Sequence, residues 1–249
     1  NVHFPDSFQL YARAKKTFVY EEFFFQRLFL IKRRELLKKI NKKRNKIEFK
    51  FKNKLLKELP FELMDFQKKA IEEIEKDIFS NHVFSRLLQG DVGSGKTLVA
   101  LITMLSVIEA GYQTALMVPT EVLAKQHYKT ITNLLKNFDI KIGLLLGGIK
   151  KREKDELLDK IKSGEIKLII GTHALFSDEV KYKDLGYVVI DEQQRFGVEQ
   201  RYQLINKGDA VDLLMMTATP IPRSLALSLY GDMEITLMSG TIRGRIPVK

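Results

Sequence analysis

Short apolar runs alternate with longer amphipathic stretches through most of the chain after residue 59. Several runs are apolar at almost every position, which is typical of parallel strands covered on both faces. The expected strands are residues 83–88, 115–118, 142–146, 167–170, 187–190 and 212–216. The expected helices are residues 65–78, 98–109, 121–136, 151–162, 198–206 and 223–229. This alternation predicts an α/β fold with a parallel sheet and right-handed crossovers.

The first part of the chain has a different pattern. Apolar residues recur at steps of three and four over residues 10–29, which predicts one long helix over about residues 7–41. Its apolar face is broad around Phe23–Phe25, so we expect it to pack against more than one neighbour. The lysine-rich stretch 38–57 leaves open a solvated linker or a surface for a phosphate backbone. A basic amphipathic helix can also lie on a membrane, but the following domain offers a better partner.

Charge and glycine content divide the chain at nearly the same place. The chain carries 42 Lys and Arg against 31 Asp and Glu, a net charge of +11. Residues 1–58 hold 17 basic and 6 acidic residues, so the whole excess lies there, and all 15 glycines lie between Gly90 and Gly244. We therefore expect a basic helical linker region over 1–58 and a globular domain over 59–249.

The composition excludes several classes of protein. There is no cysteine, which rules out disulfide frameworks, thiolate metal sites and cysteine nucleophiles. No apolar run approaches the roughly 18 residues that cross a bilayer, and nothing near the start resembles a signal peptide. We therefore expect a cytoplasmic protein without a membrane partner. Because the chain opens at Asn1 rather than Met, we also expect it to be a fragment.

A glycine-rich loop follows the first predicted strand. It fits the pattern G-x-x-x-x-G-K-[ST], and its predicted nucleotide-binding residues are Gly90, Asp91, Val92, Gly93, Ser94, Gly95, Lys96 and Thr97. Glycines let backbone N–H groups wrap a phosphate, and the next helix turns its positive end to the same anion. Lys96 supplies a cation for the β- and γ-phosphates of ATP, and the Thr97 hydroxyl is placed to bind Mg²⁺.

Two carboxylates follow the buried strand that ends at Ile190. Asp191 and Glu192 stand at the carboxyl end of a strand, where α/β sheets bind ligands. Asp191 is predicted to share Mg²⁺ with Thr97, and Glu192 is predicted to orient and activate the attacking water. With Lys96 they form the predicted catalytic set, which indicates NTP hydrolysis rather than nucleotide binding alone.

Further motifs make the resemblance to one family clear. They are Phe66-Gln67, Pro119–Ala124, Gly147-Gly148, Gly171–Leu175, Asp191–Val198 and Thr217–Arg223, together with the helix around Phe18, Glu21-Glu22 and Gln26. At these positions the chain resembles superfamily 2 helicases, and within them the RecG-type branch-migration helicases. The resemblance covers essentially the whole chain.

The resemblance implies a RecA-like P-loop NTPase domain behind a long basic helical segment. It implies an ATP- and Mg²⁺-dependent DNA helicase of recombination and repair, which reverses forks and migrates Holliday junctions. Gln67 would read adenine. Contacts to DNA would come from Pro119, Thr120, Gly147, Gly148, Thr172, His173 and Arg195, and coupling to the ATP site from Gln194, Thr217, Ala218 and Thr219. A wedge domain before Asn1 and a second RecA-like domain after Lys249 are implied as well.

One departure and two alternatives accompany this interpretation. Gln194 stands where the family usually has His, but Gln still donates and accepts hydrogen bonds, so we expect function to survive. Translocases of transcription-repair coupling share the runs 195–198 and 217–223 but tend to have Asp-Glu-Glu at residues 191–193. A nucleotide-sensing DNA-binding module without turnover is the other alternative that the sequence leaves open.

Overall fold

The computed structural model describes residues 3–45, 47–191, 207–219 and 233–240. In chain order the elements are α1 (Phe8–Lys38), α2 (Lys50–Glu58), α3 (Asp65–Ile78), β1 (Ser85–Gly90), α4 (Lys96–Glu109), β2 (Gln113–Met117), α5 (Glu121–Leu134), β3 (Ile142–Leu145), α6 (Lys151–Ser163), β4 (Leu168–Gly171), the 3₁₀ helix η1 (His173–Phe176), β5 (Leu185–Ile190), β6 (Asp212–Thr217) and β7 (Glu234–Met238).

The strands form one seven-stranded sheet in the order β3-β4-β2-β5-β6-β1-β7. All six pairings are parallel, so the carboxyl ends of all the strands lie at one edge. We call this the carboxyl edge and the opposite one the amino edge. The predicted α/β class and parallel sheet are confirmed.

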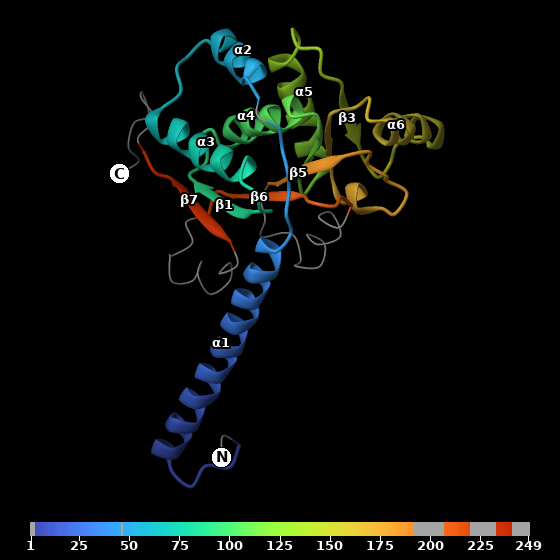
Figure 1. Ribbon diagram of the computed structural model, residues 1–249. Coiled ribbons are helices and arrows are strands. Elements are labelled where there is room, and N and C mark those ends of the chain that lie inside the picture. The colour runs from blue at the N-terminus through green and yellow to red at the C-terminus, as the bar shows by residue number, and fades with distance from the viewer. Residues whose placement is uncertain (1–2, 46, 192–206, 220–232, 241–249) are drawn as a thin grey trace.

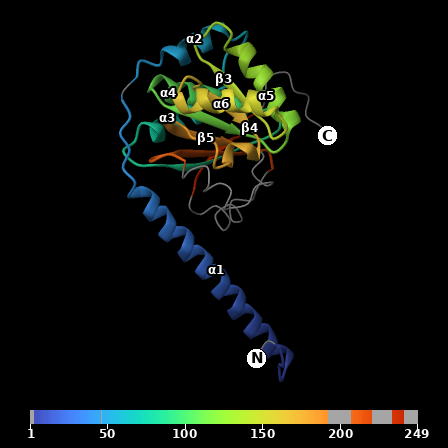
Figure 2. The ribbon, with the colours of Figure 1, turned by 90° about the vertical axis from the view of Figure 1, so that its right-hand side faces the viewer.

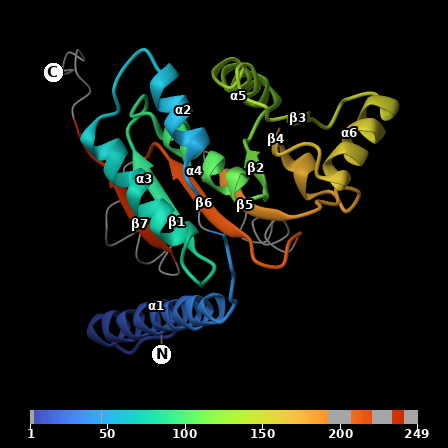
Figure 3. The same cartoon turned by 45° about the horizontal axis from the view of Figure 1, so that its top comes forward.

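Helices α3, α4 and α5 cover one face of the sheet, and α2 lies over α4 (Figures 1 and 3). Helix α4 is buried on nearly every side because it lies between the sheet, α2 and α3, as its nearly continuous apolar sequence requires. A second core cluster includes Ile161 of α6, Leu175 of η1 and Val180 of the following loop.

The observed elements differ from the predicted ones in a few places. Strand β7 was not predicted, because it pairs only with β1 at the border of the sheet and only two of its five residues are buried. Helix α2 was not predicted either. Its lysines obscure a short apolar stripe in which Leu55 is buried and Phe51 and Leu56 pack on the core. The predicted helices 198–206 and 223–229 lie outside the described residues.

Helix α1 confirms the predicted long helix and projects away from the sheet (Figure 2). Its aromatic side chains are largely exposed: Phe18 is 62%, Phe23 54% and Phe25 64% exposed. The expectation that this apolar face packs against several neighbours is therefore wrong within the part of the chain that the structure describes. No helix among the described residues is long and apolar enough to cross a membrane.

The segment after α1 crosses the amino edge of the sheet and is fixed there by buried charges. The Lys42 ammonium lies 2.7 and 2.6 Å from the two carboxylate oxygens of Asp212, and Arg44 Nη1 lies 2.5 Å from Oδ2. Arg44 also donates to the carbonyl of Gly186, and the N–H of Phe84 donates to Asp212 at 3.0 Å. Burial lowers the pKa of Lys42 to about 8, against the pull of the Asp212 carboxylate. We call Lys42, Arg44 and Asp212 the amino-edge clamp.

This arrangement gives several side chains of the basic stretch 38–57 structural contacts within the domain. Lys42 and Arg44 are structural, Lys52 pairs with the Glu75 carboxylate at 2.5 Å, and Lys54 donates to the carbonyl of Asn137. These side chains belong to the packing of the domain. Exposed lysines in this stretch remain as candidates for phosphate contact, among them Lys39, Lys43, Lys50 and Lys57.

Candidate functional site

The P-loop connects β1 to α4 through two glycines in left-handed conformation. Gly93 has φ +81° and Gly95 has φ +86°, a region that glycine enters without steric cost. Gly95 is also the N-cap of α4, so the helix begins directly at the loop. The positive end of α4 is thus directed at the space that the loop encloses.

Polar groups of the loop are only partly satisfied. The ammonium of Lys96 donates to the carbonyls of Gly90 and Asp91 at 2.7 and 2.9 Å. The Ser94 hydroxyl is buried and has no hydrogen-bond partner among the described residues. Leaving such a group buried without a partner costs about 1–3 kcal/mol. A phosphate oxygen in the loop would supply the missing acceptor.

Gln67 is brought against the loop from α3. Its Oε1 accepts from the N–H of Met64 and its Nε2 donates to the carbonyl of Ser94, both at 2.9 Å. A cavity of about 850 Å³ lies beside it, lined by residues 61–68 with Gly93, Gly95 and Leu98. The cavity is large enough for a base and ribose, so adenine recognition by Gln67 stays a prediction with a suitable space next to it.

The other candidate nucleotide residues follow the neighbouring strands. Gly90 ends β1, Thr217 ends β6 and Asp191 follows β5, and these three strands are adjacent in the sheet. The hydroxyls of Thr217 and Thr219 lie 2.8 Å apart, and the N–H of Thr219 also donates to the Thr217 hydroxyl at 3.2 Å. Ala218 joins them in the sequence, so three predicted coupling residues, at the end of β6 and just after it, follow the strand between the P-loop strand and the Asp191 strand.

Asp191 is held by the strand next to it and by a helix. Its N–H donates to the carbonyl of Met117 in β2 at 2.9 Å, and its Oδ2 lies 3.3 Å from Nε2 of His127 on α5. Both side chains are 13% exposed. The carboxylate therefore lies at the carboxyl edge with a defined orientation.

The residues present fit a magnesium ion. A hydroxyl from Thr97 and a carboxylate from Asp191 are oxygen ligands of the kind that Mg²⁺ takes, usually one or two from protein and the rest from phosphates and water. In the described part of the chain no group of three or more His, Cys, Asp or Glu could hold a metal ion. A cation here would thus depend on the phosphates held by the loop.

The candidate DNA residues occupy the other half of the same edge. Pro119-Thr120, Gly147-Gly148 and Thr172-His173 follow β2, β3 and β4, which are neighbours. A Cβ added to Gly147 would lie 3.9 Å from both Glu121 Oε1 and His173 Nε2, so segments from all three connections meet. The Thr120 hydroxyl accepts from the N–H of Leu123 at 3.3 Å and caps α5.

Not every predicted residue lies on this surface. Gly147, Gly148 and His173 are exposed, whereas Thr172 is 2% exposed and its hydroxyl has no partner within the described ranges. Glu192, Gln194 and Arg195 lie outside the described residues, and their roles stay predictions. Glu121 lies inside the motif Pro119–Ala124 but was not singled out. His127 was missed, although it lies two turns along the helix that follows Thr120.

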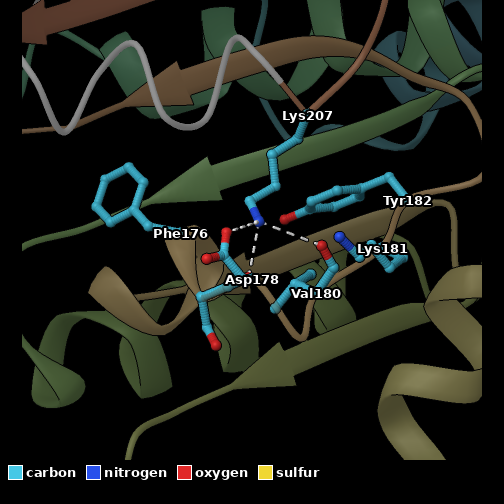
Figure 4. A pocket seen from close by; sticks show the side chains of 7 residues that line it. Phe176, Asp178, Val180, Lys181, Tyr182 and Lys207 are labelled. Atoms are coloured by element: carbon cyan, nitrogen blue, oxygen red, sulfur yellow. Dashed lines mark hydrogen bonds and ion pairs between the residues drawn. The ribbon is translucent and has the colours of Figure 1, made fainter.

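A second cavity of about 630 Å³ lies under the loop between η1 and β5 and is not part of this site. Figure 4 shows Lys207 reaching into it, where the ammonium donates to the carbonyl of Ser177 at 2.7 Å and lies 3.8 Å from the Asp178 carboxylate. Burial raises the pKa of Tyr182, whose hydroxyl has no hydrogen-bond partner in the part of the chain that the structure describes. The cavity lacks the glycine loop and helix start that mark the nucleotide site.

Fold and site together define a P-loop NTPase of RecA-like architecture. A glycine loop opens a helix, an aspartate follows a second parallel strand, and a strand with two threonines lies between them. The DEAD/DEAH box helicase family matches residues 64–227. The chain belongs to this family.

Among curated proteins, the chain is similar to helicases of one kind. It is 47% identical over 247 residues to the ATP-dependent DNA helicase RecG of Borreliella burgdorferi, covering 99% of this chain and 36% of the relative. It is 46% identical over 248 residues to RecG of Thermotoga maritima, covering 100% and 32%. The chain therefore spans about a third of the length of these relatives.

Solved structures of helicases also match the chain. RecG bound to a three-way DNA junction matches with a TM-score of 0.83 and 43% identity, over 98% of this chain and 33% of that one. The UvsW helicase of bacteriophage T4 matches with a TM-score of 0.55 at 15% identity, over 78% and 69%. The second likeness concerns the fold alone.

Proposed function

We propose that this chain is the ATP-binding motor lobe of a helicase that acts on branched DNA, reversing forks and migrating junctions. The observation that carries the proposal is the strand order. Candidate phosphate, cation and coupling residues follow β1, β5 and β6, whereas candidate DNA residues follow β2, β3 and β4. One edge of one sheet thus offers adjoining sites for a nucleotide and for nucleic acid. The similarity to RecG bound to a junction supports branched DNA as the substrate.

The nucleotide half of the edge would act mainly by holding phosphates. Lys96 would exchange two loop carbonyls for phosphate oxygens, a charge-assisted and therefore stronger hydrogen bond. The Ser94 hydroxyl would gain an acceptor. Mg²⁺ bound with Thr97 and Asp191 would supply charge neutralisation for the phosphates. Glu192, the next residue along the chain, would take the proton of the attacking water.

We infer that catalysis also needs a second RecA-like lobe from the rest of a full-length protein. Phosphoryl transfer is stabilised by cations around the transferred group, and an arginine supplied by a second element contributes about 10³–10⁵ in rate where it has been compared. The chain covers 36% of its Borreliella relative, which leaves room for such a lobe. Thr217 and Thr219 would be the residues that sense its approach.

The test is DNA-stimulated ATPase of the full-length protein on a three-way junction. Glu192→Gln keeps shape and hydrogen bonding but removes the base, so turnover should fall by about 10²–10⁴ while nucleotide binding is retained. Asp159→Asn, the same acid-to-amide change at an exposed position on α6, is the matched control. Near-normal turnover by Glu192→Gln would refute its role. A wild-type protein whose ATPase ignores DNA would contradict the helicase proposal.

A further inference from the structure

The two halves of the carboxyl edge meet at one pair of strands. Strand β2 carries the segment that leads into α5 and belongs to the DNA half, whereas β5 leads to Asp191 and belongs to the nucleotide half. The two strands pair in register up to Met117 and Ile190. Asp191 is therefore the first residue beyond the paired strands, directly at the border between the halves.

One side chain crosses this border. His127 lies on α5, the helix that Thr120 caps, and its Nε2 lies 3.3 Å from Oδ2 of Asp191. A carboxylate has only acceptors, so Nε2 is the atom of this imidazole that could act as a donor toward it. With 13% of each side chain exposed, water competes little for this contact. The imidazole thus engages Oδ2 rather than Oδ1.

We propose that His127 is a positioning residue that orients the Asp191 carboxylate for its cation and couples α5 to the nucleotide site. This inference rests on the proposed function. Groups that hydrogen-bond a metal ligand fix its orientation, and their loss typically costs 10–100-fold in metal affinity or activity. Helix α5 begins at the candidate DNA segment. A DNA strand that displaces the start of α5 would therefore also move the His127 imidazole that contacts Asp191.

A purely structural role predicts something different. If His127 only fastened α5 to the sheet, its replacement would lower stability without altering how the protein uses Mg²⁺. Three substitutions separate these roles. His127→Leu keeps much of the volume but has no donor, His127→Gln keeps an N–H at a similar reach, and Thr130→Ala is a control at an exposed position on the same helix.

The experiment uses the full-length protein in two assays, of which the ADP-binding assay involves no turnover. Calorimetry measures ADP affinity with and without Mg²⁺, and steady-state ATPase on a three-way junction measures kcat, KM and the half-saturating Mg²⁺ concentration. For His127→Leu we expect ADP binding without Mg²⁺ to be unchanged and the half-saturating Mg²⁺ to rise about 10-fold or more. We expect kcat to fall more than KM rises, and DNA to stimulate the ATPase less. His127→Gln should recover most of each loss, and Thr130→Ala should match wild type.

Each outcome has a defined meaning. If His127→Leu and His127→Gln both keep the wild-type Mg²⁺ requirement, or lose function equally, the positioning role is overturned. Should His127→Leu not fold, His127→Asn replaces it, because its shorter amide does not reach Asp191, and the same comparison with His127→Gln decides. A wild-type protein that does not bind Mg²⁺–ADP, or whose ATPase ignores DNA, overturns the proposed function instead.

Discussion

The two edges of the sheet differ in how most of their buried polar side chains are satisfied, although the buried Tyr182 hydroxyl, three residues before β5, has no partner in the described parts of the chain. At the amino edge Asp212 is completely buried, and its carboxylate accepts from Lys42, Arg44 and the N–H of Phe84. At the same edge the buried amide of Gln113 takes part in four hydrogen bonds, two as donor to the carbonyls of Ile161 and Ile166 and two as acceptor from the N–H groups of residues 183 and 184.

At the carboxyl edge comparable groups are less well satisfied. The hydroxyls of Ser94 and Thr172 are buried without a hydrogen-bond partner in the described parts of the chain, and Lys96 donates to carbonyls of its own loop. Polar networks that are fully satisfied fix one geometry, whereas a buried group without a partner still has hydrogen-bonding capacity that a ligand or a water molecule can use. The amino edge thus contributes buried ion pairs that fasten the chain after α1 to the sheet, whereas the carboxyl edge carries the buried hydroxyls that the proposed ligands would satisfy.

The largest expected effect is on the ATPase rate, and it tests how much of the catalytic site the carboxyl edge of this chain contains. We expect residues 1–249 alone to hydrolyse ATP about 10³–10⁵ times more slowly than the full-length protein on branched DNA, because they lack the arginine cations that we propose a second lobe supplies. The measurement is steady-state ATPase of both proteins, with ADP binding by the fragment as the control for folding. Comparable turnover would assign the catalytic cations to this chain.

Breaking the amino-edge clamp should affect stability and leave the ligand site alone. Asp212→Ala leaves two buried cations unpaired, so the free energy of unfolding should fall by about 3–5 kcal/mol. Asp178→Ala is the matched control. Its carboxylate is fully exposed and lies 3.8 Å from Lys207, so its removal should change the free energy of unfolding far less. Chemical denaturation measures both, and equal effects would show that the clamp is not a stabilising centre.

A substitution in the P-loop at the carboxyl edge should weaken ligand binding and leave stability unchanged. Lys96→Ala removes a charge-assisted hydrogen bond to phosphate, so ADP should bind more weakly by about 1.5–3 kcal/mol. Calorimetry of wild type and variant is the measurement, and Lys129→Ala, at an exposed position on α5, is the control. Equal ADP affinity in wild type and Lys96→Ala would refute the nucleotide site.

The smallest expected effect is on the salt dependence of DNA binding, and it tests the exposed lysines of the basic stretch 38–57. The structure assigns Lys42 and Arg44 to the clamp, so their replacement should destabilise the domain rather than change DNA binding selectively. Lys39, Lys43 and Lys57 are exposed instead. Replacing these three by Ala should flatten the log–log salt dependence of DNA affinity by up to about 0.9 for each phosphate that is no longer neutralised. An unchanged slope would identify them as a solvated surface.

Much of the carboxyl edge could be predicted from the sequence because local motifs define it. The loop 90–97, the strand before Asp191 and the strand that ends in Thr217 each carry their chemistry in consecutive residues, and the parallel sheet then brings their ends together. Helix α3 was predicted with the bounds that it has, since its apolar residues keep the helical period.

The amino edge could not be predicted, because its contacts join distant parts of the chain. Lys42 and Asp212 are separated by 170 residues, and a lysine in a basic run gives no sign that it is buried. The same limit applies to His127. Its partner Asp191 follows a different strand, and only the order β2-β5 brings the two side chains together.

Thermal unfolding of the full-length protein with and without Mg²⁺–ADP tests the contrast between the edges most directly. A ligand that binds only the folded state stabilises it by about 2.7 kcal/mol at a hundred times its Kd. We predict that Asp212→Ala lowers the Tm without ligand but keeps the upward shift on adding Mg²⁺–ADP. Lys96→Ala should keep the ligand-free Tm and lose most of that shift. If both variants lowered the ligand-free Tm alike and their Tm rose alike on adding Mg²⁺–ADP, the assignment of stability to the amino edge and of ligand binding to the carboxyl edge would be wrong.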